Sequence, residues 1–127
     1  DIADIAQKTT MVCIMSIADR IREGRKITVE VDGKTFTGTR ATFEQFAEYV
    51  QDRTTNAQVA RNHITGWDGI TEADLIESGS AKEAVNFSRE LFAEAIADNI
   101  DWQVKIADAI LADAMKRAQL KADNEKK

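Results

Sequence analysis

The fold is decided by residues 27–39, which read ITVEVDGKTFTGT. Apolar and polar residues alternate up to Val31, the period of a half-buried strand. Asp32-Gly33 follows, the dipeptide that best tolerates the positive φ angles of a type I′ turn. A second run then returns with Phe36 facing inward, so the stretch predicts a β-hairpin. Because two strands alone are marginally stable, the hairpin must pack on a helix or pair with another chain.

Helices are predicted on both sides of this hairpin. Before it, residues 2–22 are expected to form one helix that Gly24 ends. Its apolar contacts would be Ile2, Ile5, Val12, Ile17 and Ile21. After the hairpin, Thr42 and Gln45 form a capping box at the start of the next helix. Thr55 is expected to begin a further short helix.

The second half begins with residues 66–80, which are rich in Gly, Ser and acidic residues and are expected to form a loop. Ser80, three residues before Glu83, is another candidate helix cap. Ser88 is expected to cap a short helix that ends at about Asp98.

The last helix is predicted from about Ile100 to Lys121. Six of its residues are spaced 4-3-4-3-4, as in a heptad seam: Ile100, Val104, Ala107, Leu111, Ala114 and Ala118. Ile106 and Ile110 would widen this stripe. Residues 122–127 are expected to be a frayed, solvated tail.

Together these elements predict an α+β fold that is mostly helical. One β-hairpin near residues 27–39 would pack with about four to five helices in a single domain over residues 1–127. Residues 1–14 are expected to be a native extension or a leader, because Met15 could open a reading frame of its own.

The charge of the chain is unevenly distributed. The net charge is −5, and residues 68–101 hold nine acidic and two basic side chains, a net of −7. Nucleic acid is therefore not expected as the main partner, because phosphate binding needs a basic surface. A DNA mimic would be the exception. No apolar run approaches the ~20 residues of a membrane span, so we expect no membrane partner.

No constellation of residues indicates catalysis. His63 is the only histidine, and we expect it at a surface or at the end of a helix. Cys13 is the only cysteine and is expected to be a buried structural thiol. The acidic residues near Asp68 lack the oxygen spacing of a calcium loop. We therefore expect no enzyme activity, no cofactor and no metal.

Trp67 and Trp102 are the residues with two open interpretations. Tryptophan is enriched at binding hot spots, so both could anchor a partner. Both could equally be core residues that hold a loop to a helix.

Residues 60–98 resemble the tail assembly chaperones of long-tailed phages, most closely the lambda-like siphophages. In that family a Trp-x-Gly segment ends a helix, an acidic loop follows, and a Phe-Ser-x-Glu segment opens the next helix. The matching residues are Trp67, Gly69, Phe87, Ser88, Glu90 and Leu91. The chain departs from the pattern because no proline precedes the Phe-Ser pair.

The resemblance implies a chaperone that binds the tape measure protein, keeps it soluble and recruits tail tube subunits. It would act in the host cell cytoplasm and be absent from the mature virion. The tape measure protein is largely helical, and an Ala-lined seam suits such a client. The expected partner-binding residues are Trp67, Asp68, Phe87, Trp102, Ile106, Ile110 and Leu111. A homo-oligomer is also expected, through edge pairing of the hairpin.

Other classes of function stay open. The interpretation as a small acidic regulator, such as a DNA-mimic inhibitor, depends on the net charge of −7 over residues 68–101. A structural tail protein retained in the virion is a further alternative.

Overall fold

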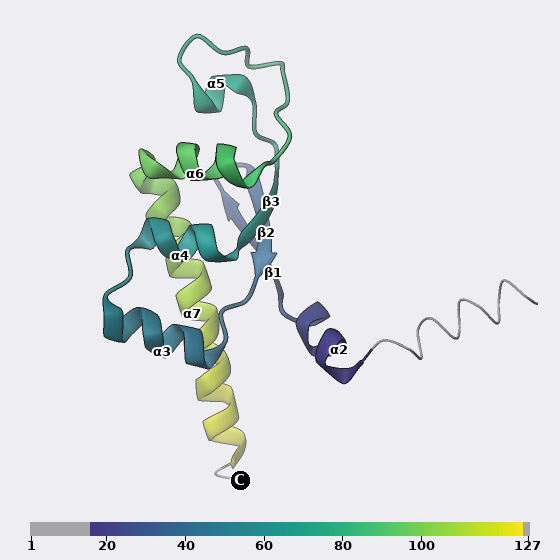
Figure 1. Cartoon of the computed structure of the whole chain (residues 1–127), viewed down its shortest axis with the longest axis vertical. Helices are drawn as coiled ribbons and strands as arrows, with labels where there is room; N and C mark the ends of the chain where they lie inside the picture. Colours follow the sequence, from purple (N-terminus) through teal and green to yellow (C-terminus); the bar gives the residue numbers. More distant parts are fainter. Residues whose placement is uncertain (1–15, 126–127) are drawn as a thin grey trace, which may run out of the picture.

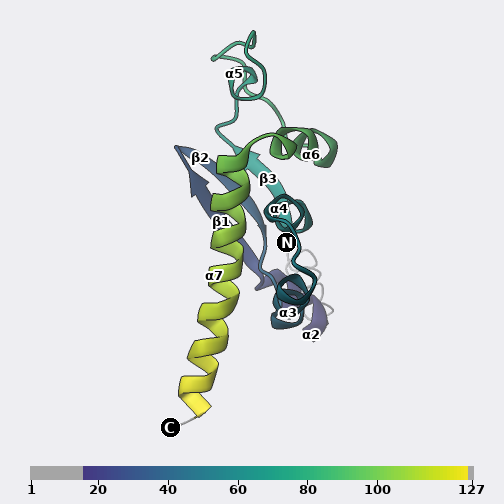
Figure 2. The ribbon, with the colours of Figure 1, turned by 90° about the vertical axis from the view of Figure 1, so that its left-hand side faces the viewer.

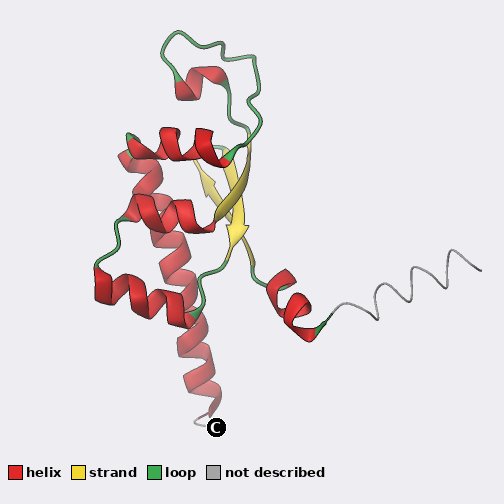
Figure 3. Ribbon diagram, viewed as in Figure 1, coloured by secondary structure: helices red, strands yellow, loops and turns green. Residues whose placement is uncertain are grey.

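The hairpin at the centre of the fold is present, and a third strand extends it. The computed structural model describes residues 16–125. In chain order its elements are α2 (Ile17–Glu23), β1 (Lys26–Val31), β2 (Lys34–Thr39), α3 (Phe43–Asp52), α4 (Asn56–His63), β3 (Ile64–Asp68), α5 (Glu72–Leu75), α6 (Arg89–Ala97) and α7 (Ile100–Glu125). Figures 1 and 3 show helices around one small sheet. The mostly helical α+β class is therefore confirmed.

The turn of the hairpin has the predicted geometry. Val31 pairs with Lys34, which leaves a two-residue turn between the strands. Asp32 and Gly33 have φ angles of 51° and 82°, both in the left-handed region that such a turn requires. Phe36 is fully buried, as the alternation predicted.

The third strand replaces the start of the expected loop. β3 pairs antiparallel with β2, and the strand order is β1-β2-β3. The prediction of a loop over residues 66–80 is therefore wrong at 66–68, and also at α5, which forms one helical turn. α4 passes directly into β3 at Ile64, without a linker. Gly38 of β2 allows the backbone of His63 to lie directly against β2, because a Cβ at position 38 would lie 2.0 Å from the His63 carbonyl oxygen.

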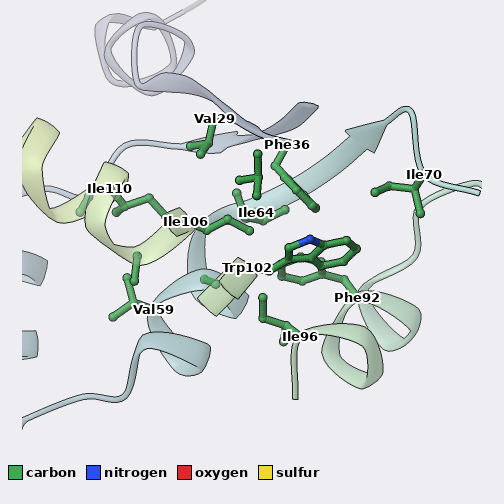
Figure 4. Close-up of a cluster of buried hydrophobic side chains, with 14 of the residues drawn as sticks. Val29, Phe36, Val59, Ile64, Ile70, Phe92, Ile96, Trp102, Ile106 and Ile110 are labelled. Atoms are coloured by element: carbon green, nitrogen blue, oxygen red, sulfur yellow. The ribbon is translucent and has the colours of Figure 1, made fainter. Parts of the chain in front are cut away.

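One hydrophobic core lies between the sheet and the helices α4, α6 and α7. Figure 4 shows Phe36, Phe92 and Trp102 meeting at its centre. The Phe36 ring centroid lies 5.1 Å from that of Trp102 and 6.1 Å from that of Phe92, within the range of favourable edge-on aromatic pairs. The surrounding buried side chains include Val29, Val31, Val59, Ile64, Ile70, Ile96, Ile106 and Ile110. This single core accounts for the arrangement of residues 26–114.

Three of the four predicted helix caps are present. Thr42 and Gln45 form the capping box of α3, with N···O distances of 2.9 and 3.1 Å. Thr55 caps α4 and Ser88 caps α6 through their hydroxyl groups. Ser80 begins no helix. Its hydroxyl accepts from the Lys82 N–H inside a turn, so that prediction is wrong.

The last helix is longer than predicted, and the first is described only from Ile17. The described part of the first helix is α2, which ends at Gly24 as expected, but its Ile17 and Ile21 side chains are exposed. The other expected contacts of that helix, Ile2, Ile5 and Val12, and also Cys13, lie outside the described residues. α7 continues to Glu125, so residues 122–125 are helical rather than frayed.

None of the helices within residues 16–125 is long and apolar enough to cross a membrane.

Candidate partner-binding surfaces

The residues that carry the family resemblance hold two elements of the fold together. The Trp67 and Phe87 rings pack edge to face, with centroids 5.3 Å apart. The Trp67 indole Nε1–H donates a hydrogen bond of 2.7 Å to the Val85 carbonyl. Gly69 has a φ of +80°, and Ser88 caps α6. Trp67 and Phe87 are both half-buried, so they join the end of β3 to the start of α6 and serve the fold first.

Between these two residues the chain forms a folded excursion, residues 69–86, here called the acidic lobe. Glu72 N–H donates to the Glu83 carbonyl, and Ala73 N–H donates to the Ser80 carbonyl. Gly79 packs so closely on Glu72 that a Cβ would lie 2.4 Å from its backbone. The lobe therefore has a fixed internal structure. In Figure 1 it projects from one end of the molecule, beyond α6.

A salt bridge fastens the acidic lobe to the hairpin. Asp74 lies 3.4 Å from the Lys34 ammonium, and both side chains are largely buried. Burial raises the pKa of Asp74, but hydrogen bonds from Thr71 and the Lys34 charge outweigh it, so this pKa lies below its ordinary value. Asp68, which was expected to bind a partner, is exposed at the base of the lobe.

Three of the expected partner-binding residues belong to the core. Trp102 is 5% exposed, and Ile106 and Ile110 are fully buried. Their side chains face the sheet and α4 in the folded chain (Figure 4), so they offer no surface to a partner. The core interpretation of Trp102 is the one that the fold supports.

The seam predicted along α7 divides into a buried edge and an outer edge. Ala107 and Ala114 are buried with the core, whereas Ile100 is 74% exposed and Val104 is 39% exposed. Leu111 is half-buried. Helical periodicity places six residues on the outer edge, here called the outer seam: Ile100, Val104, Leu111, Met115, Ala118 and Ala122.

An open groove lies beside the C-terminal part of this seam, between α3 and α7. It has a volume of about 450 Å³. Its lining is Phe43, Ala114, Arg117, Ala118, Lys121 and Ala122, here called the α3–α7 groove. Phe43 is 63% exposed at the first position of α3. The lining thus combines an exposed aromatic ring, small apolar residues and two cations.

The α3 helix extends this apolar surface away from α7. Ala47 and Val50 follow Phe43 by four and seven residues, so they share its face of the helix, and both are exposed. The sequence interpretation missed Phe43 as a site residue. Its signal was a large aromatic residue directly after a capping threonine.

His63 is buried rather than at the surface, although it does end a helix as expected. The Tyr49 hydroxyl lies 2.7 Å from its Nε2 and the Thr39 hydroxyl 3.3 Å from its Nδ1. Asn62 donates a hydrogen bond to the Tyr49 oxygen, so Asn62, Tyr49 and His63 form one connected polar chain. Burial lowers the pKa of His63, and a hydrogen bond with Thr39 opposes this only in part.

No metal centre is formed within residues 16–125, where no three His, Cys, Asp or Glu side chains are grouped to hold an ion. The comparisons with protein families, curated proteins and solved structures found no match for this chain.

Proposed function

We propose that this protein is a non-catalytic binding protein that holds a helical segment of another protein in the α3–α7 groove. Its specific role would be that of a tail assembly chaperone for a phage tape measure protein. The observation that carries this proposal is the exposure of Phe43 beside the alanine face of α7. An amphipathic helix docks in such a groove by placing its apolar residues at i, i+3, i+4 and i+7.

The lining of the groove favours a helix over an extended peptide or a small molecule. Ala118 and Ala122 are one helical turn apart, and side chains this small allow a second helix to approach closely. Lys121 adds a positive charge at the same surface, whereas Arg117 is paired with Asp113, 3.0 Å away on α7. A client segment with carboxylates beside its apolar stripe would complement this charge.

The resemblance over residues 60–98 supports the choice of client. Its Trp67 and Phe87 pair positions the acidic lobe at the end of the molecule opposite the C-terminus of α7 (Figure 1). The lobe is then the surface for tail tube subunits, while the groove holds the tape measure protein. The protein acts in the host cytoplasm and leaves before the virion is complete.

Co-expression with the tape measure protein of the same phage tests this proposal. The expected result is a soluble complex that co-purifies, whereas the client expressed alone should be insoluble. Phe43→Asp should abolish co-purification, because it sets a charge where an apolar contact is needed, while Asp is well tolerated in the first turn of a helix.

Ile76→Asp is the matched control. Ile76 is 56% exposed, close to the 63% of Phe43, but it lies in the acidic lobe. The client should still co-purify with this variant. Loss of the complex in both variants, or in neither, would overturn the assignment of the groove.

A small acidic regulator, such as a DNA-mimic inhibitor, is the second candidate. The fixed structure of the acidic lobe favours it, because a mimic needs carboxylates on a rigid support. However, the Asp74 and Glu72 carboxylates accept hydrogen bonds within the lobe. Competition with duplex DNA for a DNA-binding protein is the measurement that would select this function.

A further inference from the structure

The first strand of the sheet has one side that no described element pairs with, here called the β1 edge. β3 pairs with β2, so β2 is the central strand and β1 ends the sheet. All six residues of β1 pair with β2 in an unbroken register, and none of them is a proline. In Figure 2 α7 crosses one face of this sheet. A regular edge of this kind can pair with a further strand.

The unpaired backbone groups of the β1 edge belong to Lys26, Thr28 and Glu30. In an antiparallel pair, successive residues direct their N–H and C=O groups alternately towards the neighbouring strand and away from it. The Arg25 carbonyl accepts a hydrogen bond from the Arg40 N–H, so the odd-numbered residues of this strand bond within the hairpin. The even-numbered residues direct their groups outward. Within residues 16–125 no group outside the hairpin bonds to them.

One antiparallel register of two β1 strands matches these backbone groups and the charges together. With Thr28 opposite Thr28, Lys26 of each copy lies opposite Glu30 of the other. All three residues direct their backbone groups outward, so each facing pair can exchange its hydrogen bonds. Their side chains are exposed on the outer face of the sheet. The two-fold symmetry therefore forms the pair of Lys26 and Glu30 twice, as directly opposite charges.

Other registers lack this match. Centring the pair on Val29 keeps the hydrogen bonds but sets Glu30 opposite Thr28. Centring it on Lys26 or on Glu30 places two like charges directly opposite each other, which destabilises a pair of strands. A parallel pairing in register likewise sets each charged residue beside its own copy. The charges therefore select the antiparallel arrangement about Thr28.

The inner face of the paired strands is apolar in the same register. Ile27 then lies opposite Val29 of the second copy. Within one copy Val29 is 5% exposed, whereas Ile27 is only half-buried beside the core. A second β1 strand would cover part of the Ile27 surface that remains exposed, and this burial favours association.

The side of α7 next to the β1 edge carries a small residue. The two-fold axis is perpendicular to the sheet, so the helices of both copies lie on the same face of it. Lys105 marks the side of α7 next to β1, because it lies 3.3 Å from Asp32 at the end of that strand. Ala112 follows Lys105 by two turns on the same side of the helix and is exposed. Its short side chain lets the second α7 lie close.

We propose that two copies of this chain form a symmetric dimer by antiparallel pairing of their β1 strands, with Thr28 on the two-fold axis. The two three-stranded sheets then form one sheet of six strands. The contact is the same on both copies, so it closes on itself and does not propagate. The sequence predicted pairing through the hairpin, and only its β1 side remains for this, because β3 covers β2. No residue of β1 lines the α3–α7 groove, so the dimer and client capture can fail independently.

Sedimentation equilibrium of the full chain gives the first test, with two variants at one position. Thr28→Pro removes the outward N–H, which edge strands tolerate, and should convert the dimer into a folded monomer. Thr28→Val keeps this N–H and should remain a dimer. Far-UV circular dichroism checks the fold of both variants. A parent protein that is monomeric at all concentrations, or a folded Thr28→Pro variant that stays dimeric, would overturn the proposal.

Charge reversal provides a test that restores as well as disrupts and that needs no change of the backbone. Lys26→Glu should raise the dissociation constant of the dimer roughly tenfold at low salt, because it sets an acid opposite Glu30 in both pairs. Adding Glu30→Lys to the same chain should restore the affinity. Lys82→Glu is the matched control, since it makes the same change in net charge at an exposed position of the acidic lobe. No recovery in the double variant would contradict the register.

Disulfide trapping in a Cys13→Ser background tests the position of the two-fold axis. Thr28→Cys should form a covalent dimer with itself, because the two Cα atoms would be about 5.5 Å apart, within the range of a disulfide. Thr37→Cys is the control. Thr37 is exposed on β2 directly beside Thr28, but the two copies of β2 would be roughly 14 Å apart, at three strand spacings. Absence of a Thr28→Cys dimer, or equal cross-linking of the two variants, would contradict pairing at the β1 edge.

Discussion

At the scale of single residues, His63 shows how burial changes chemistry. Its imidazole is enclosed by Tyr49 and Thr39, and burial lowers its pKa below the ordinary value of about 6.5. Below that pH the unfolded chain binds a proton that the folded chain does not. The stability that the neutral His63 side chain contributes is therefore fully present above about pH 6.5, and it is lost as the pH falls towards the lowered pKa.

We expect the free energy of unfolding, measured by urea titration, to fall between pH 7 and pH 5, with a slope of at most about 1.4 kcal/mol per pH unit for this one proton. His63→Gln should flatten the curve over the same range. The carboxylates with lowered pKa values, Asp19, Asp32 and Asp74, affect stability only at lower pH. Parallel curves for the two proteins would show that His63 is not the responsible group.

Gly38 is a second residue for which the surrounding geometry determines the effect of a substitution. A Cβ there would meet three backbone atoms of His63 and Ile64 within 3 Å, and backbone cannot move aside as a side chain does. Gly38→Ala should therefore lower the free energy of unfolding by roughly 3 kcal/mol. Gly24→Ala is the control, because its Cβ would be 3.5 Å from the nearest carbonyl oxygen. Similar urea midpoints for the two variants would contradict this prediction.

At the scale of elements, the two tryptophans have separate roles. Trp67→Phe removes the hydrogen bond to Val85, worth about 1 kcal/mol, and should speed amide exchange in the acidic lobe while the amides of α7 stay protected. Trp102→Phe changes the core beside Phe36 and should lower protection throughout the fold. Faster exchange of α7 in the Trp67 variant would mean that its pair with Phe87 supports the whole fold.

The elements that the sequence predicted are those whose signals are local. The Asp32-Gly33 turn and the Thr42, Thr55 and Ser88 caps depend on neighbouring residues, and each lies where it was predicted. β3 was not predicted from the sequence. Its five residues, with Gly66 at their centre, form a strand only because they pair with β2. That pairing is a tertiary contact that no local pattern encodes.

The candidate site was harder to predict for a related reason. Periodicity identified an apolar stripe on α7, but it could not say which edge of that stripe the sheet would cover. Ile106 and Ile110 proved to be core, while Val104 and Ile100 stayed exposed. Phe43 was missed because exposure of an aromatic residue depends on how α3 docks.

At the scale of the whole molecule, α7 is longer than the core that it supports. Its last buried residue is Ala114, and beyond it the helix projects from the body of the protein (Figure 2). The C-terminal part therefore contributes surface rather than core.

A chain ending at Gln119 should keep its free energy of unfolding within about 1 kcal/mol, since residues 120–124 are exposed. The same chain should lose the client, because Lys121 and Ala122 line the groove. Urea unfolding and co-purification measure the two effects separately. An unfolded truncated chain would show instead that the last turns stabilise the monomer.

The closure of the acidic lobe by Trp67 and Phe87 has a consequence for how this protein can vary. Because the two ends of the lobe are joined to each other and to the core, its length and composition are uncoupled from the register of β3 and α6. Insertions beside the exposed Ser78 should be accommodated, whereas Asp74 and Leu75 must remain because they hold the lobe to Lys34 and to the core. The lobe is thus a natural position for an affinity tag or a fluorescent reporter, and for divergence between relatives that share the same scaffold.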